Sequence, residues 1–352
     1  MKISFMLKRE DFYTINQKTL EKYYISGKTK KRLYIYPELN AIVTAHPSKT
    51  VRKYLYTEFR VNGSFVKRLL VRLYATALLN SCGMLAAKSV TLRTDANADT
   101  LIYPCNKKYR VFEFDKNEVS VLGKHGFPTD DLSREIVFRT QNSADFIPGL
   151  LRSSEQGYSE VIIDGCPVAR TGGRMMQLCD KAFAIWSAYI ADGIQQIPAD
   201  TYAKMLDEQM EEIKQKARAL GKQMDESRLD ALWTQLLNVL KNAQEEVPVG
   251  LSHGDLQAGN IWVENGTDKL YIIDWESWKN RSSWYDKAVL YEGLRRTDGL
   301  TRYSACQDVV HATVLLEDII FRLTELTTLP LDYGCAEFDA YINTLCGGTV
   351  HV

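Results

Sequence analysis

A short stretch near residue 260 constrains the fold of this chain more than any other part of its sequence. From Leu251 onward the residues are LSHGDLQAGNIWVENGTDKLYIIDWESW. Two apolar runs flank the Asn-Gly pair, and these runs are 261–264 and 270–273. Asn-Gly between two apolar runs predicts a β-hairpin. Such a hairpin returns Asp274, at the end of its second strand, to the loop that carries Asp255 and Asn260.

Three short oxygen-bearing side chains are therefore expected to meet at one point. A hard cation such as Mg²⁺ prefers oxygen ligands, and the Asn260 carbonyl with the Asp274 carboxylate supplies two of them. Phosphates and water complete such a coordination shell. The remaining carboxylate, Asp255, can accept a proton from an attacking hydroxyl group. The pattern predicts phosphoryl transfer, with Asp255 as the base and with Asn260 and Asp274 as metal ligands.

The motif HGDxxxxN, followed by IIDWE, resembles the aminoglycoside phosphotransferase and choline kinase group, small-molecule kinases that share the protein-kinase fold. The resemblance implies an α+β chain with a two-lobed protein-kinase-like fold: a small, mainly β N-lobe and a mainly helical C-lobe. It also implies ATP or GTP as the phosphoryl donor, with Mg²⁺. The competing interpretation of the same stretch is a turn and a surface hairpin with chance acidic residues.

The bulk composition excludes several other classes. Lys+Arg and Asp+Glu both number 44 in the 352 residues, so the overall charge gives no reason to expect a nucleic-acid partner. Seven cysteines are scattered without a C-x-x-C pair, and charge interrupts the apolar residues of the opening MKISFMLKRED too early for a secretory leader. No run approaches 18 apolar residues. We therefore expect a cytoplasmic protein with reduced thiols and no integral membrane segment.

Changes in the pattern of apolar and polar residues along the sequence predict three regions. Residues 1–95 form an N-terminal α/β extension of unknown role, and alternating strands begin near Ser89. Residues 96–164 form the N-lobe. Residues 165–352 form the helical C-lobe, with the catalytic loop at 252–260 and the metal-binding Asp274. Apolar residues at helical spacing predict C-lobe helices at 175–190, 200–220 and 229–240.

A basic amphipathic helix is expected at 65–85. Its apolar residues recur at helical spacing: Phe65, Leu69, Leu70, Leu73, Ala77 and Leu78. Lys67, Arg68 and Arg72 lie among them. Such a helix can lie on an anionic membrane, but because its basic residues are few, we favour packing against the neighbouring lobe.

The family resemblance identifies the nucleotide-binding candidates in the N-lobe. Lys124, at the end of a strand, would pair with the phosphates, and Glu135, on the following helix, would orient it. Lys88 is the competing lysine. The turn at 104–108 contains no glycine, unlike the glycine-rich loop that covers the phosphates in protein kinases. Its backbone amides or Lys107 and Lys108 could still contact phosphate.

The resemblance also assigns the strand that leads into the C-lobe. Val161, Ile162 and Ile163 would line the pocket for the nucleotide base. His253 would be structural, packing under the catalytic loop, because Asp255 already supplies a base. Asp286 would brace the helix that follows it.

An aromatic group follows the catalytic stretch, and it could hold a cationic acceptor or stack on a sugar. Its members are Trp275, Trp278, Trp284, Tyr285 and Tyr291, with Glu276 and Glu292 nearby. Ordinary core packing is the alternative. The expected acceptor is the hydroxyl of a sugar, aminosugar, aminoglycoside or amino alcohol. The other functions kept open are a non-catalytic pseudokinase or scaffold, and a kinase acting on a protein or a membrane-linked glycan.

Overall fold

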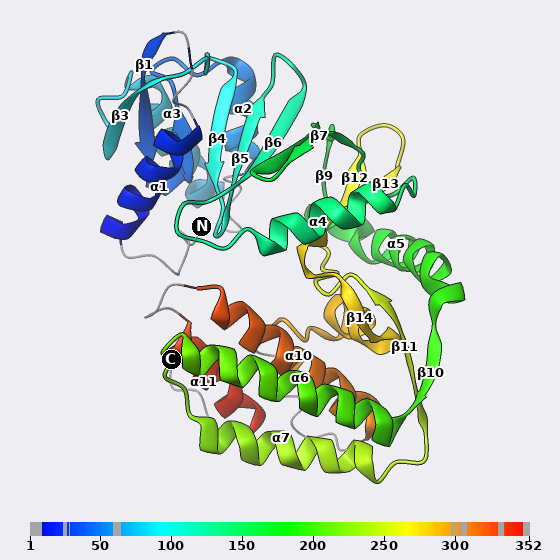
Figure 1. Ribbon diagram of the computed structural model, residues 1–352. Helices are drawn as coiled ribbons and strands as arrows, with labels where there is room; N and C mark the ends of the chain where they lie inside the picture. The colour runs from blue at the N-terminus through cyan, green and yellow to red at the C-terminus, as the bar shows by residue number, and fades with distance from the viewer. Residues whose placement is uncertain are drawn as a thin grey trace. The chain divides into compact units, whose positions relative to one another are not determined.

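The computed structural model describes residues 9–23, 27, 29–58, 65–296, 299–300, 303, 308–329 and 334–347. These residues divide into two compact units (Figure 1). The first unit comprises Met1–Ile136 and Gly149–Ile162, and the second comprises Val137–Pro148 and Ile163–Val352.

The first unit is built on an eight-stranded antiparallel sheet with the order β3-β1-β2-β4-β5-β6-β8-β7. Its strands are β1 (Lys30–Tyr36), β2 (Ala41–Val43), β3 (Lys88–Arg93), β4 (Thr100–Pro104), β5 (Lys108–Glu113), β6 (Glu118–Gly123), β7 (Leu150–Ser154) and β8 (Gly157–Val161). Buried and partly buried residues alternate along β6, as the two-residue period of a strand requires. The predicted extension and the predicted N-lobe therefore share one sheet.

Helices cover this sheet. They are α1 (Arg9–Tyr23), α2 (Lys49–Glu58), α3 (Phe65–Asn80) and the start of α4 (Asp130–Gln141), with a 3₁₀ turn η1 (Pro37–Leu39) between β1 and β2. Val51 and Leu55 of α2 join Leu101, Phe112 and Val119 of the sheet in one buried core. Helix α1 is tied to the sheet by the Tyr23 hydroxyl, which donates to the Gly123 carbonyl over 2.8 Å.

Helix α3 corrects one prediction. Most of the predicted buried stripe is exposed: Phe65, Leu69, Leu70, Leu73 and Ala77. The side chains that enter the core are Ala75, Leu78 and Leu79. This helix carries apolar residues on two sides, and the sequence period alone could not tell which side meets the sheet. The side chains of Lys67 and Arg68 lie outside the described residues.

The second unit is mainly helical. Its helices are α5 (Met175–Ile190), α6 (Ala199–Ala219), α7 (Glu226–Lys241), α8 (Ser283–Lys287), α10 (Val309–Thr327) and α11 (Cys335–Leu345), with a π-helical segment η6 (Ala288–Glu292). Short 3₁₀ turns are η2 (Val168–Arg170), η3 (Gly172–Arg174), η4 (Ala191–Gly193) and η5 (Trp275–Ser277). Two three-stranded sheets accompany them, with the orders β10-β11-β14 and β13-β12-β9. Their strands are β9 (Gly165–Pro167), β10 (Gln195–Pro198), β11 (Glu246–Ser252), β12 (Ile261–Glu264), β13 (Leu270–Ile272) and β14 (Lys279–Ser282).

Two buried cores organise this unit. In one, α6, α7, α10 and α11 pack together (Figure 1). Every apolar residue predicted for the α7 stripe is buried there: Leu229, Leu232, Trp233, Leu236, Leu237 and Leu240. The other core gathers α5 and the strands of the hairpin around Trp186 and Trp275. Apolar residues of the predicted catalytic stretch are therefore part of the second core.

The α+β fold class is confirmed. A unit built on an antiparallel sheet supplies most of the N-terminal half, and a mainly helical unit supplies the rest, in the element order expected for a protein-kinase-like chain.

Among the residues that the structure describes, none of the helices has both the length and the apolar character needed to cross a bilayer.

Candidate active site

The predicted hairpin is present. Strands β12 and β13 pair in antiparallel register, with Ile261 opposite Ile272. One step beyond this pair, the backbone N–H of Ile273 donates to the Asn260 carbonyl over 2.9 Å. The hairpin therefore places Asp274 directly after the residue that is bonded to Asn260. The loop between the strands runs from Asn265 to Lys269, longer than a two-residue turn.

Asn260 binds the predicted base directly. Its side-chain nitrogen donates to the Asp255 backbone carbonyl over 2.8 Å and to the Asp255 carboxylate over 3.0 Å. The side-chain amide of Gln257 donates to the other carboxylate oxygen over 2.6 Å. These bonds use the amide nitrogen of Asn260, so its amide oxygen is the atom left to bind a cation.

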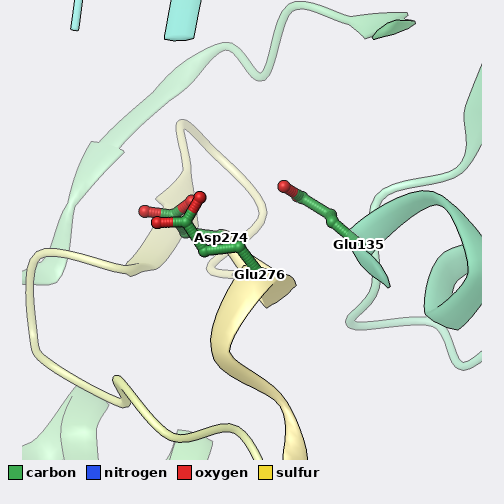
Figure 2. A group of neighbouring side chains, drawn as sticks. All are labelled: Glu135, Asp274 and Glu276. Atoms are coloured by element: carbon green, nitrogen blue, oxygen red, sulfur yellow. The ribbon is translucent and has the colours of Figure 1, made fainter. Parts of the chain in front are cut away.

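Asp274 lies at a sharp bend of the chain. Its φ of 70° and ψ of 57° are left-handed, a conformation that is uncommon for a residue other than glycine. The bend leads into the 3₁₀ turn η5, which carries Glu276. Figure 2 shows the side chains of Asp274 and Glu276 next to each other, and their carboxylate oxygens lie within 4.8 Å. Two acidic oxygens thus stand together at the end of the hairpin.

His253 is structural, as predicted. Its ring is fully buried and lies 4.5 Å from the Trp275 ring, centroid to centroid. The backbone N–H of Asp255 donates to Nδ1 over 3.2 Å, so Nδ1 is an acceptor and Nε2 is the nitrogen that donates to the Ile273 carbonyl over 3.0 Å. One imidazole thereby links the predicted catalytic loop to the end of the hairpin.

The Asp286 carboxylate binds the loop that carries Asp255. One carboxylate oxygen accepts from the Ser252 hydroxyl and the Gly254 N–H, both over 3.0 Å. The other accepts from the His253 N–H and the Trp186 indole, both over 2.9 Å. The sequence predicted a brace for the helix after Asp286, whereas the structure directs this carboxylate to the loop, 32 to 34 residues earlier in the chain.

Arg295, which the sequence analysis did not single out, connects the loop to α10. Its guanidinium donates to the Gly254 carbonyl over 3.0 Å, pairs with Asp318 at 2.9 Å and approaches the Asp255 carboxylate to 3.7 Å. Burial opposes ionisation of Asp318, but the positive charges of Arg295 and Arg322 hold its pKa below the ordinary value. A fixed positive charge therefore stands beside the predicted base.

In the first unit, the lysine that pairs with Glu135 differs from the predicted one. Glu135 (Figure 2), on α4, forms an ion pair with Lys108 at 3.1 Å and accepts a hydrogen bond from the Tyr158 hydroxyl over 2.8 Å. Glu135 is fully buried, and Lys108 is 8% exposed. A neighbouring pair, Lys107 with Asp131, is formed at 3.0 Å.

Lys124, the predicted partner of Glu135, binds the glycine-free turn at 104–108 instead. Its ammonium donates to the carbonyl of Cys105 over 2.8 Å and contacts the carbonyl of Asn106 at 3.5 Å. Burial lowers its pKa from 10.5 to about 8. The strand register explains why Lys108, and not Lys124, pairs with Glu135. Lys108 lies opposite Gly123, the last paired residue of β6, and Lys124 follows Gly123 and reaches the turn at 104–108. The competing Lys88 lies over the Tyr13 ring, 5.4 Å from its centroid.

The three residues expected in the base pocket differ in environment. Val161 ends β8 and is 47% exposed, whereas Ile162 packs against the core of the first unit. Ile163 begins the second unit's main segment. Their role in base binding stays a prediction.

Two of the five aromatic residues beside the hairpin are core residues. Trp275 and Tyr285 are fully buried, and Arg281 and Arg295 already lie over the Tyr285 ring. The Tyr291 hydroxyl donates to Asp180 over 2.9 Å. Trp278 and Trp284 are partly buried. The alternative of ordinary packing therefore holds for Trp275 and Tyr285.

The role of Asp286 predicts a large loss of stability for Asp286→Asn. An amide presents N–H groups to donors that now meet a carboxylate, so the free energy of unfolding should fall by at least about 2 kcal/mol. Urea denaturation measures it. The control is Asp192→Asn, at an exposed position, where the change should stay within about 0.5 kcal/mol. Equal stability of Asp286→Asn and the wild type would contradict the assignment.

The lowered pKa of Lys124 predicts a pH-dependent stability. Between about pH 8 and pH 10.5 the unfolded chain binds a proton at this lysine that the folded chain does not. Stability attributable to Lys124 should therefore rise with pH across this window, by up to about 3 kcal/mol. The measurement compares urea denaturation of the wild type and Lys124→Met from pH 7.5 to 10.5. Lys204→Met, at an exposed position, is the control; parallel curves for Lys124→Met and the wild type would refute the prediction.

Comparison with known proteins gives a family match in the second unit. The phosphotransferase enzyme family matches residues 177–307, a segment that contains Asp255, Asn260, Asp274 and Asp286. No curated protein sequence matches the chain.

Several solved structures are similar at low identity. A thermostable mutant of an aminoglycoside phosphotransferase is 13% identical with a TM-score of 0.47, covering 72% of this chain and 94% of its own. An ethanolamine kinase from Plasmodium vivax is 13% identical with a TM-score of 0.43, covering 88% and 96%. A choline/ethanolamine kinase family protein from Mesorhizobium loti is 11% identical with a TM-score of 0.43, covering 70% and 87%.

The sequence match, rather than these distant structural similarities, carries the assignment. Within residues 177–307 the chain matches the phosphotransferase enzyme family, which confirms the resemblance that the loop and hairpin predicted and the phosphotransferase class that follows from it.

Proposed function

We propose that this chain transfers the γ-phosphoryl group of ATP or GTP to a hydroxyl group of a small molecule. The expected acceptors are sugars, aminosugars, aminoglycosides and amino alcohols. The observation that supports this most is the bonding of Asn260. Its side chain binds the Asp255 carboxylate while its backbone carbonyl binds the residue before Asp274. A base and two metal ligands are thereby joined through one residue.

Asp255 acts as the base in this proposal. The acceptor oxygen forms a bond to the γ-phosphorus as the bond to the β,γ-bridging oxygen breaks, and the hydroxyl proton passes to the Asp255 carboxylate. The nucleoside diphosphate leaves with the bridging oxygen. Gln257 and Asn260 fix the carboxylate by hydrogen bonds, and the guanidinium of Arg295 lies 3.7 Å from it. Because the transition state is loose, orienting the hydroxyl matters more than the strength of the base.

The residues at the end of the hairpin fit a magnesium ion. The donors are the Asn260 amide oxygen and the Asp274 carboxylate, with the Glu276 carboxylate close to the latter. All are hard oxygen atoms, the kind that Mg²⁺ selects. When bound, Mg²⁺ would neutralise charge on the phosphates of the nucleotide. The left-handed backbone conformation of Asp274 places its carboxylate at the bend, where it would bind the ion.

Lys108 and Glu135 are the proposed nucleotide-orienting pair. A lysine held by a helix carboxylate is the arrangement that fixes α/β-phosphates in kinases, and Lys108 has that partner at 3.1 Å. Lys124, the sequence-based candidate, binds backbone carbonyls of the neighbouring turn. We therefore assign Lys108 the role first expected of Lys124.

One observation favours a second function, a non-catalytic nucleotide-binding module. The turn at 104–108 lacks glycine, and carbonyl groups of Cys105 and Asn106 point to the Lys124 ammonium. Such a turn differs from a glycine-rich lid that offers N–H groups to phosphate. Formation of ADP or GDP in the presence of any acceptor separates the two functions.

The proposed base predicts the behaviour of Asp255→Asn. An amide cannot take the hydroxyl proton, so turnover should fall by a factor of about 10² or more while nucleotide affinity stays within about threefold. Turnover is measured as ADP release with a panel of sugars, aminoglycosides, choline and amino alcohols. The control is Asp268→Asn, an exposed acid on the hairpin loop. Turnover equal to that of the wild type in Asp255→Asn would remove Asp255 from the reaction.

The proposed metal site predicts the behaviour of Asp274→Ala. Loss of a carboxylate ligand should weaken binding of Mg-ATP by at least about tenfold, because phosphate charge is then less well neutralised. Isothermal titration calorimetry, with magnesium and with EDTA, gives the affinities. Asp268→Ala is the matched control. Unchanged Mg-ATP affinity in Asp274→Ala would show that this carboxylate does not hold the metal.

A further inference from the structure

The exposed side of α3 is the largest unexplained apolar surface on a single helix among the described residues. Six large apolar side chains there are at least 46% exposed: Phe65, Val66, Leu69, Leu70, Leu73 and Tyr74. At about 100° per residue they cover roughly half of the helix circumference. Soluble proteins rarely leave such a surface bare, and where they do, it marks a site of interaction.

This surface is not the side by which α3 is anchored. Ala75, Leu78 and Leu79, on the opposite side of the helix, enter the core of the first unit. The Tyr56 hydroxyl of α2 and the Thr76 hydroxyl of α3 lie 3.0 Å apart and share a hydrogen bond. The apolar core contacts of α3 therefore come from one side of the helix, and the hydrogen bond of Thr76 is formed near one edge of the exposed side.

The sequence that contains α2 and α3 is strongly basic. Residues 49–80 contain seven lysines and arginines and a single acidic residue, Glu58. Of these cations, Lys49, Lys53 and Arg72 are exposed on α2 and α3. Residues 1–94 as a whole carry 18 basic and 5 acidic residues, a net charge of +13, whereas residues 95–352 carry 26 basic and 39 acidic residues, a net charge of −13. The net charge of the whole chain is zero because a basic N-terminal region is balanced by an acidic remainder.

We propose that the exposed side of α3 docks this chain onto an anionic membrane surface. The apolar side chains would enter the boundary between headgroups and acyl chains, and Lys49, Lys53 and Arg72 would remain at the level of the anionic headgroups. This proposal does not depend on the proposed phosphoryl transfer.

Charge decides against the two other occupants. A second copy of the chain, related by two-fold symmetry, would bring the same positive region against itself. A nucleic acid would pair with the lysines and arginines, but it would leave the aliphatic side chains of Leu69, Leu70 and Leu73 in water. An anionic bilayer satisfies both the charges and the apolar side chains.

Vesicle flotation of the full chain, without nucleotide or acceptor, tests the proposal. The vesicles are phosphatidylcholine alone, and phosphatidylcholine with about 30 mol% phosphatidylglycerol. We expect at least about tenfold more protein to float with the anionic vesicles. Raising NaCl from about 0.1 M to about 0.5 M should reduce that binding, because salt screens the attraction between the lysines and the headgroups.

Two double variants separate α3 from the rest of the surface. Leu70→Glu with Leu73→Glu should lower binding to anionic vesicles by at least about tenfold. The control, Met176→Glu with Met205→Glu, adds the same charge at apolar positions exposed to a similar extent in the second unit, and it should float like the wild type. All four positions are exposed, so both variants should keep the melting temperature of the wild type.

Three results would overturn the proposal. The first is a wild-type chain that floats with neither vesicle. The second is flotation of Leu70→Glu with Leu73→Glu equal to that of the wild type. The third is a wild-type dimer, seen by light scattering, that this variant dissociates, because a second copy would then cover α3.

Discussion

The buried carboxylate of Asp286 is the interaction on which the candidate active site depends. Two backbone N–H groups, a serine hydroxyl and an indole all donate to it, and three of these four donors belong to residues 252–254. A carboxylate that accepts several donors in a buried place is costly to disturb, because each donor would be left without a partner. These bonds therefore stabilise the observed backbone conformation of the loop that carries Asp255. The hairpin follows this loop directly, and Asn260, the residue before β12, is hydrogen-bonded to Asp255.

Two further contacts extend this constraint to the remaining parts of the site. The His253 ring joins the loop to the end of β13, because the same imidazole binds the backbone of Asp255 and that of Ile273, the residue before Asp274. Arg295 joins the loop to Asp318 on α10, and a positive charge thereby stays near the Asp255 carboxylate. The proposed base, Asp255, and the proposed metal ligand, Asp274, thus lie in segments that buried side chains hold in place. Substitutions at such positions should act on stability and on geometry together.

The first unit adds a different kind of constraint, one of charge. Its sheet and helices carry an excess of lysines and arginines, and most of the acidic residues belong to the rest of the chain. Within this basic region the buried pairs Lys107 with Asp131 and Lys108 with Glu135 use two cations internally. Lys49, Lys53 and Arg72 on α2 and α3 are exposed instead, and α3 also exposes six large apolar side chains. The unit therefore combines two buried lysine–carboxylate pairs with an exposed surface that is both apolar and basic.

The sequence by itself determined the elements whose signals are local. The Asn-Gly hairpin, the loop from Asp255 to Asn260 and the helices α5 and α7 follow from turn chemistry and from periodicity over a few residues, and all were predicted at nearly their observed bounds. Only the tertiary structure decided which lysine meets Glu135, since that depends on the register in which Lys108 lies opposite Gly123. It likewise decided that Asp286 binds a loop more than 30 residues away, and which side of α3 meets the core. In each case the deciding contact joins segments distant in the chain, and the local pattern is compatible with more than one partner.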